Sequence, residues 1–157
     1  MNKFFIILVF CVGINTTSQI ATSGINNSGT NASAIGYQTS AINTASTAMG
    51  NSSTASGNPS KAMVWLTAAG GKASTAFGKS TIASDFGSLI IGQYNLSGST
   101  VTNSATQPNP ANTAFLIGNG TASNAKSDAF KVMVNGNTTI GNDLTVSGDV
   151  VVSSDAR

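Results

Sequence analysis

Between Ser33 and Gln93, small and large apolar residues recur at fixed positions every 14 residues, separated by polar ones. A second column of alanines follows the first, and Ser, Thr, Gly and Asn interrupt every candidate helical face. Within each unit the residues alternate at period two, which is typical of strands. The repeat therefore predicts an all-β solenoid of 14-residue coils, each with the order strand, turn, strand, turn. The recurring triplets are Ala34-Ile35-Gly36, Ala48-Met49-Gly50, Ala62-Met63-Val64, Ala76-Phe77-Gly78 and Ile90-Ile91-Gly92, and the second column is Ala41, Ala55, Ala69 and Ala83.

The large apolar residues of the repeat are expected on the outside of the coil. Alternate residues of a strand point to opposite faces, so two alanine columns can line a thin interior while the large column points outward. An exposed apolar ridge of this length is unusual on a soluble monomer, and symmetric self-association is the commonest way to cover one. The repeat thus predicts an oligomer whose contact residues are Ile35, Met49, Met63, Phe77 and Ile91.

Three positions in the repeat carry more specific expectations. Ile90 replaces the interior alanine, which predicts that the interior widens or ends at the fifth coil. Val64 replaces glycine in the third unit, which puts the turn geometry of that unit in question. The position two after the second alanine is expected to adopt a left-handed turn conformation, because its residues tolerate one; they are Asn43, Gly57, Gly71 and Asp85.

Outside residues 21–94, which hold the repeats, the chain changes character twice. Residues 95–113 contain Pro108 and Pro110 among Ser, Thr and Asn, and predict a long loop leaving the roll. Residues 114–157 predict short strands, with a turn at Asn135-Gly136 and strands at 138–140, 144–146 and 150–152. Such short strands cannot bury both faces alone.

The N-terminal segment has the outline of a secretory signal peptide, expected over residues 1–20. Lys3 precedes an apolar run from Phe4 to Ile14, which is shorter than the roughly 20 residues that span a bilayer. The alternative is a membrane anchor. Cys11 lies inside this run and is expected to leave with it, so the mature chain would have no cysteine, no membrane span and a location outside the cytoplasm.

Composition narrows the candidate chemistry. The net charge is +2, the lysines are scattered, and there is no Glu or His. These features argue against nucleic acid as a partner and remove the usual general bases and metal ligands, so no cofactor, metal or enzymatic activity is expected. Tyr37 and Trp65 occupy the position after the glycine column, two coils apart. They are candidate surface contacts that would stack on a sugar ring, or else residues at the rim of a trimer contact.

Two units, Ser33-Ala34-Ile35-Gly36 and Ser46-Thr47-Ala48-Met49-Gly50-Asn51, resemble the head repeats of trimeric (YadA-like) autotransporter adhesins. The resemblance implies a left-handed parallel β-roll and a homotrimer. Phe115 to Ile140 resembles the connector of bacterial and phage fibre proteins, which precedes a trimeric β-prism.

The last residues, Ser153 to Arg157, resemble the start of an endosialidase-type intramolecular chaperone. That family cuts itself between a serine and an aspartate, here Ser154 and Asp155. The lysine that the family places downstream is absent, so this chain would not cleave itself as written. We expect either a fragment of a longer protein or an accidental likeness.

The leading functional hypothesis is an exported, surface-exposed homotrimeric fibre or adhesin segment that attaches to a host-cell or glycan receptor. A phage tail-fibre receptor-binding segment on a virion is one alternative. A monomeric ice- or surface-binding solenoid is another, but its threonine columns are interrupted, for example by Lys61 and Ala68. A polysaccharide-degrading β-helix would need clustered carboxylates, and Asp85 is alone within the repeats.

Overall fold

The computed structural model describes residues 21–96 and 104–150, so the expected signal peptide and the Ser154-Asp155 junction lie outside the described residues. The described chain is all-β, as predicted, and is arranged in two sheets. No helix in these two ranges is long and apolar enough to cross a membrane. The long strands form the first sheet and the two-residue strands form the second.

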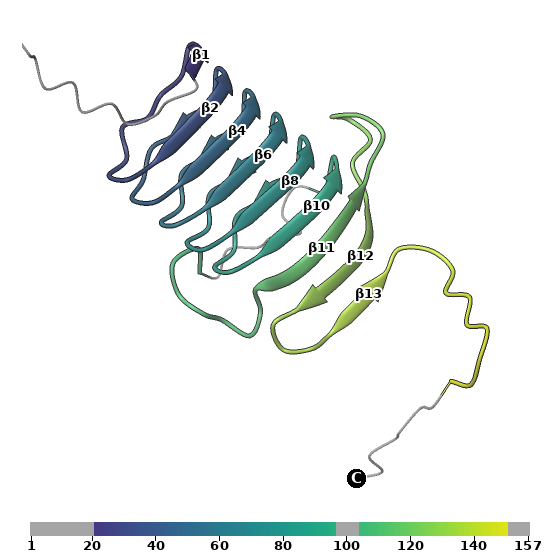
Figure 1. Ribbon diagram of the computed structural model, residues 1–157. Helices are drawn as coiled ribbons and strands as arrows, with labels where there is room; N and C mark the ends of the chain where they lie inside the picture. Colours follow the sequence, from purple (N-terminus) through teal and green to yellow (C-terminus); the bar gives the residue numbers. More distant parts are fainter. Residues whose placement is uncertain (1–20, 97–103, 151–157) are drawn as a thin grey trace, which may run out of the picture.

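Both sheets follow the stack of coils, and Figure 1 labels the strands of the nine-stranded sheet. The nine-stranded sheet has the order β1 (Ala21–Ser23), β2 (Ser33–Tyr37), β4 (Thr47–Asn51), β6 (Lys61–Trp65), β8 (Thr75–Lys79), β10 (Leu89–Gln93), β11 (Thr113–Asn119), β12 (Asp128–Met133), β13 (Thr138–Ile140). The four-stranded sheet has the order β3 (Ser40–Ala41), β5 (Thr54–Ala55), β7 (Ala68–Ala69), β9 (Ile82–Ala83).

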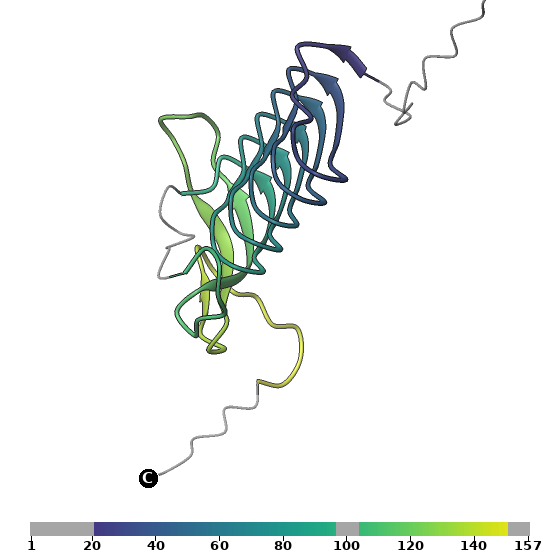
Figure 2. The same ribbon diagram turned by 90° about the vertical axis from the view of Figure 1, so that its left-hand side faces the viewer.

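Successive coils stack in parallel with the sequence repeat in register. Ala34 pairs with Ala48, and the same column continues one unit at a time to Ile90. The result is a β-solenoid of about four turns with coils of about 14 residues, and Figure 2 shows its coils nearly edge-on. The predicted repeat length and strand order are confirmed.

The interior is built from alanine and from small hydroxyl side chains. Both alanine columns are fully buried, as predicted. Two columns of Ser and Thr are buried beside them, which the sequence pattern had not singled out, and Thr67 Oγ1 donates to Ser53 Oγ at 2.9 Å. Buried hydroxyls usually have hydrogen-bond partners, and Ser46, Ser74 and Ser88 donate to backbone carbonyls. The hydroxyls of Thr39, Ser60 and Thr81 have no partner within the described residues. The hydroxyl columns are Thr39, Ser53, Thr67, Thr81 and Ser46, Ser60, Ser74, Ser88.

The predicted left-handed turn positions were wrong. Positive φ angles occur directly after β2, β4, β6, β8 and β10, as at Ser52 (53°), in the glycine column of the same strands, as at Gly50 (104°), and in the second turn, as at Ala45 (55°). They do not occur at the predicted positions, which are Asn43, Gly57, Gly71 and Asp85. Glycine is used at positions 57 and 71 for another reason: a Cβ there would collide with the backbone carbonyl of the next coil. Close approach of stacked coils, not φ, selects the small residue.

The interior of the solenoid changes at the fifth unit, where Ile90 stands in the alanine column. Ile90 pairs with Leu116 in β11, and both side chains are fully buried where earlier coils have alanine. β11 is parallel to β10 and in the same register, so the expected loop at 95–113 is an insertion between two adjacent strands, with its last residue already in β11. Its described part does not leave the roll, because the backbone N–H of Lys72 donates to the Ala105 carbonyl at 2.7 Å.

After β11, the described chain forms two further antiparallel strands and then a segment, residues 141–150, without regular secondary structure. β12 pairs with β11, and β13 pairs with β12. The strand expected at 144–146 is absent, and Leu144 and Val146 are exposed. Among residues 21–96 and 104–150, no second strand pairs with this segment, so it has no ladder to stabilise it. The strand expected at 150–152 falls almost wholly outside the described residues.

Candidate functional site

An apolar ridge crosses the outer face of the nine-stranded sheet. We use this name for the predicted contact column, and the ladder pairings place its members on one line across five adjacent strands. Met49 is 38% exposed and Phe77 47% exposed, while the other members are half-buried. The large residues therefore lie outside the coil, as predicted; their role in a subunit contact remains a prediction. The ridge residues are Ile35, Met49, Met63, Phe77 and Ile91.

The ridge continues beyond the repeats, which sequence reasoning missed. Ile117 pairs with Ile91, Phe130 with Ile117, and Ile140 with Phe130. The insertion hides this register because it breaks the 14-residue spacing, although the triplet Leu116-Ile117-Gly118 repeats the pattern of Ile90-Ile91-Gly92. An unbroken line of apolar side chains thus runs from β2 to β13.

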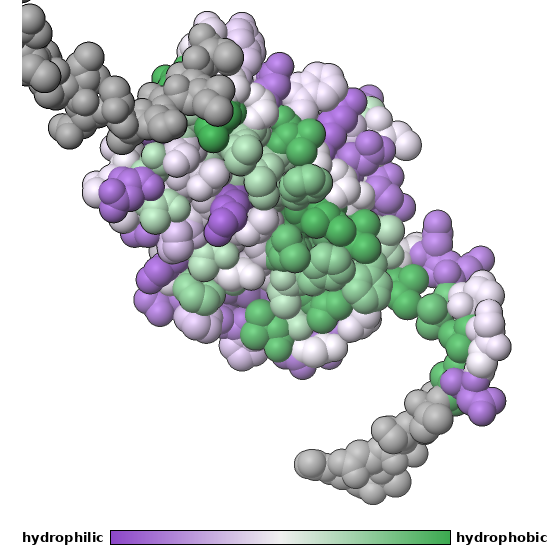
Figure 3. Space-filling model, in the orientation of Figure 1, coloured by the Kyte–Doolittle hydropathy of each residue, from purple (hydrophilic) through white to green (hydrophobic). Residues whose placement is uncertain are grey.

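The apolar surface is widest at the C-terminal half of this sheet. Leu89 is exposed and pairs with Phe115, which in turn pairs with Val132. The rings of Phe115 and Phe130 meet edge to face, with centroids 6.1 Å apart. Figure 3 shows apolar residues gathered over the C-terminal half of the sheet. A second apolar row therefore lies beside the ridge at this end.

A different line of side chains lies at the end of the same strands. Tyr37 pairs with Asn51, Asn51 with Trp65, and Trp65 with Lys79, so four successive strands present an aromatic ring, an amide, an aromatic ring and an ammonium group. We call these four residues the edge column. Tyr37 is 48% exposed and Trp65 45% exposed, and the two lie two rungs apart, about 10 Å at sheet spacing.

Sequence reasoning singled out Tyr37 and Trp65 in this column as contact residues, but not Asn51 or Lys79. The structure gives Lys79 a specific environment. Its Nζ lies 4.6 Å from the centroid of the Trp65 ring and 5.3 Å from that of Tyr94. Both are within the range of a cation–π interaction. The signal was present in the repeat, because Lys79 falls in the same 14-residue column as Tyr37 and Trp65.

Asp85 is the buried acidic residue at the junction of the roll and β11. Its Oδ2 accepts a hydrogen bond from the Thr113 backbone N–H at 2.7 Å. Burial raises the pKa of the Asp85 carboxyl, and the hydrogen bonds from Thr113 and the charge of Lys131 oppose that shift. Among residues 21–96 and 104–150, no three acidic or other metal-ligating side chains come together. Asp85 therefore anchors the returning chain to the solenoid.

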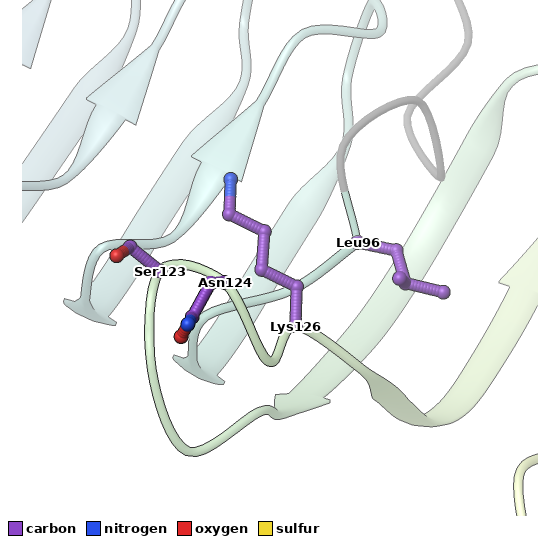
Figure 4. Close-up of a pocket in the computed structure, with 4 residues that line it drawn as sticks. All are labelled: Leu96, Ser123, Asn124 and Lys126. Carbon is purple, nitrogen blue, oxygen red and sulfur yellow. The ribbon is translucent and has the colours of Figure 1, made fainter.

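A shallow, open pocket of about 300 Å³ lies beside the turn between β11 and β12. It is lined by Leu96, Ser123, Asn124 and Lys126. Figure 4 shows these side chains pointing in different directions rather than converging on one point. The pocket has no arrangement of polar groups that would fix a small ligand.

Comparison of the chain with protein-family models, with curated protein sequences and with solved structures gave no match.

Proposed function

We propose that this chain is a segment of an exported, surface-exposed homotrimeric fibre or adhesin, which attaches to a host-cell or glycan surface and is structural rather than catalytic. The observation that carries the proposal is the unbroken apolar ridge across the nine-stranded sheet. It continues from Ile35 in β2 to Ile140 in β13, with an apolar side chain on every rung.

Self-association explains the ridge because the interior supplies little apolar burial. Alanine side chains remove little area from water, and burial contributes roughly 25 cal/mol per Å². Apart from Ile90 and Leu116, the large apolar residues of the repeat and of β11 lie on the outer face instead. Copies that pack these faces together around a common axis would bury them, and closed symmetry makes the same surface serve every subunit. We infer three subunits, and not another number, from the resemblance of the repeats to the head repeats of trimeric adhesins.

Attachment by an extended surface fits the open form of the pocket lined by Leu96 and Lys126. A stacked solenoid holds its outer residues at fixed spacing, and three copies of a weak site act together at raised effective concentration. The export signal at 1–20, the β-prism beyond β13 and the Ser154-Asp155 junction belong to the same proposal, and they rest on the N-terminal pattern and the resemblance alone.

The test is the mass of the assembly with and without the ridge. We expect the wild-type chain to have three times the chain mass by light scattering. Phe77→Asp should reduce it to a monomer, because a buried, unpaired carboxylate costs several kcal/mol. Leu66→Asp is the matched control, since Leu66 is equally exposed but lies off the ridge, and it should remain trimeric. A monomeric wild type, or a trimeric Phe77→Asp variant, would overturn the proposal.

A further inference from the structure

The edge column places two half-exposed aromatic rings two rungs apart with a short side chain between them. Tyr37 and Trp65 are separated by Asn51, and the three strands are in register. Two rungs are about 10 Å, so a ring lying above Asn51 would have about 5 Å to each aromatic side chain, within the range of ring-to-ring packing. The apolar C–H face of a pyranose suits such a position.

Asn51 supplies a hydrogen-bond donor on the strand between those that carry Tyr37 and Trp65. Its Oδ1 accepts a hydrogen bond from Ser52 Oγ at 2.8 Å. Its Nδ2 makes no hydrogen bond to any residue in the described ranges. The amide therefore presents its two N–H groups to a ligand oxygen, while its carbonyl oxygen is held by the neighbouring hydroxyl.

Lys79 gives the column a charge preference. Its ammonium lies over the rings of Trp65 and Tyr94. Within the described residues, no carboxylate forms an ion pair with Lys79. Asp85, the acidic residue of the repeats, is fully buried and accepts a hydrogen bond from the Thr113 backbone N–H. A cation held between two rings attracts an anion, and a carboxylate on a sugar adjoining the stacked ring would receive a charge-assisted hydrogen bond.

We propose that Tyr37, Asn51, Trp65 and Lys79 form a binding site for an acidic oligosaccharide, one whose sugars carry carboxylates. The chain of sugars runs along the edge column, across the strands. One ring stacks between Tyr37 and Trp65 over the Asn51 amide, and a neighbouring carboxylate pairs with Lys79. The inference rests on the proposed attachment function and names the chemistry of its receptor.

The probe is a hexasaccharide of alternating glucuronate and N-acetylglucosamine, compared with the same hexasaccharide after its carboxyls are reduced to alcohols. Trp65 is the only tryptophan in the chain, so its fluorescence reports on this site directly. We expect the acidic form to change the Trp65 emission in a saturable way. The reduced form should bind roughly tenfold more weakly, because one charge-assisted hydrogen bond is lost. Affinity for the acidic form should fall as salt rises.

The variants separate stacking from charge. Lys79→Gln should lower affinity for the acidic hexasaccharide about tenfold and leave that for the reduced form unchanged. Tyr37→Ala should lower affinity for both the acidic and the reduced hexasaccharide, because the stacking surface is lost. Lys72→Gln removes the same charge from an exposed turn away from the column and should bind both forms as the wild type does. Equal affinity for the two forms, or a Lys79→Gln variant that behaves like Lys72→Gln, would overturn the proposed site.

Light scattering on the same samples keeps the two proposals apart. A trimer that binds neither form refutes the saccharide site and leaves the assembly intact. A monomer that binds the acidic form with the expected variant pattern supports the site and refutes the assembly. An emission change that Tyr37→Ala does not alter would place the ligand elsewhere on the roll and would also refute the site.

Discussion

The side-chain amide of Asn95 makes two hydrogen bonds to the backbone of Ile82. Its Oδ1 accepts from the Ile82 N–H at 2.8 Å, and its Nδ2 donates to the Ile82 carbonyl at 3.2 Å. Ile82 lies in β9, the last strand of the four-stranded sheet. Asn95 thus occupies the place of a next strand and satisfies an edge that the insertion would otherwise leave unpaired.

Asn95→Ala should therefore destabilise the C-terminal end of the solenoid. Asn95 is fully buried, so its loss leaves two backbone groups of Ile82 without partners, each costing about 1 to 3 kcal/mol. We expect the free energy of unfolding in urea to fall by roughly 2 to 4 kcal/mol. Asn124→Ala, at an exposed turn, is the control and should change it little. Equal stability of the two variants would show that Asn95 is not a cap.

Val64 holds a backbone conformation that its neighbours in the repeat reach with glycine. Its φ is 99°, compared with 104° at Gly50 and 125° at Gly78. For a β-branched residue this conformation costs of order 1 to 3 kcal/mol. The Val64 side chain is 47% exposed, so removing it forfeits little burial.

Val64→Gly should accordingly raise the free energy of unfolding by about 1 kcal/mol, after the greater flexibility of glycine in the unfolded chain is subtracted. The reverse change, Gly78→Val, should destabilise, because a Cβ there collides with the Gly92 carbonyl as well as straining φ. Thermal unfolding of both variants tests this pair. A Val64→Gly protein less stable than wild type would mean that Val64 contributes packing that outweighs its strain.

The sequence predicted the repeating coil, but not the turn conformations, the Lys79 contacts or the register of β11. The alanine columns and the outward Phe77 follow from period-two alternation and the 14-residue repeat, which are local. The positive φ at Ser52 was missed because several residues in each turn tolerate it, and coil closure selects among them. Lys79 was missed because a cation–π contact depends on the path of the side chain. Ile117 was missed because the insertion conceals its register.

The last prediction concerns the pH dependence that Asp85 gives to the junction. Burial raises the pKa of the Asp85 carboxyl above its usual value, against the opposing effects of Thr113 and Lys131. The folded protein then holds the proton more tightly than the unfolded chain does. The resulting stabilisation is present below the unfolded-state pKa and is lost as pH rises through the raised pKa.

Asp85→Asn removes this titration while its Oδ1 still accepts the hydrogen bond from the Thr113 N–H. The unfolding free energy of the variant minus that of wild type should therefore increase from about pH 4 upward and level off above the raised pKa. Urea unfolding of both proteins across this range measures the difference. Asp143→Asn, at an exposed carboxyl beyond β13, controls for the change in net charge. A difference that shrinks as pH rises would mean that the hydrogen bonds from Thr113 and the charge of Lys131 outweigh burial at Asp85.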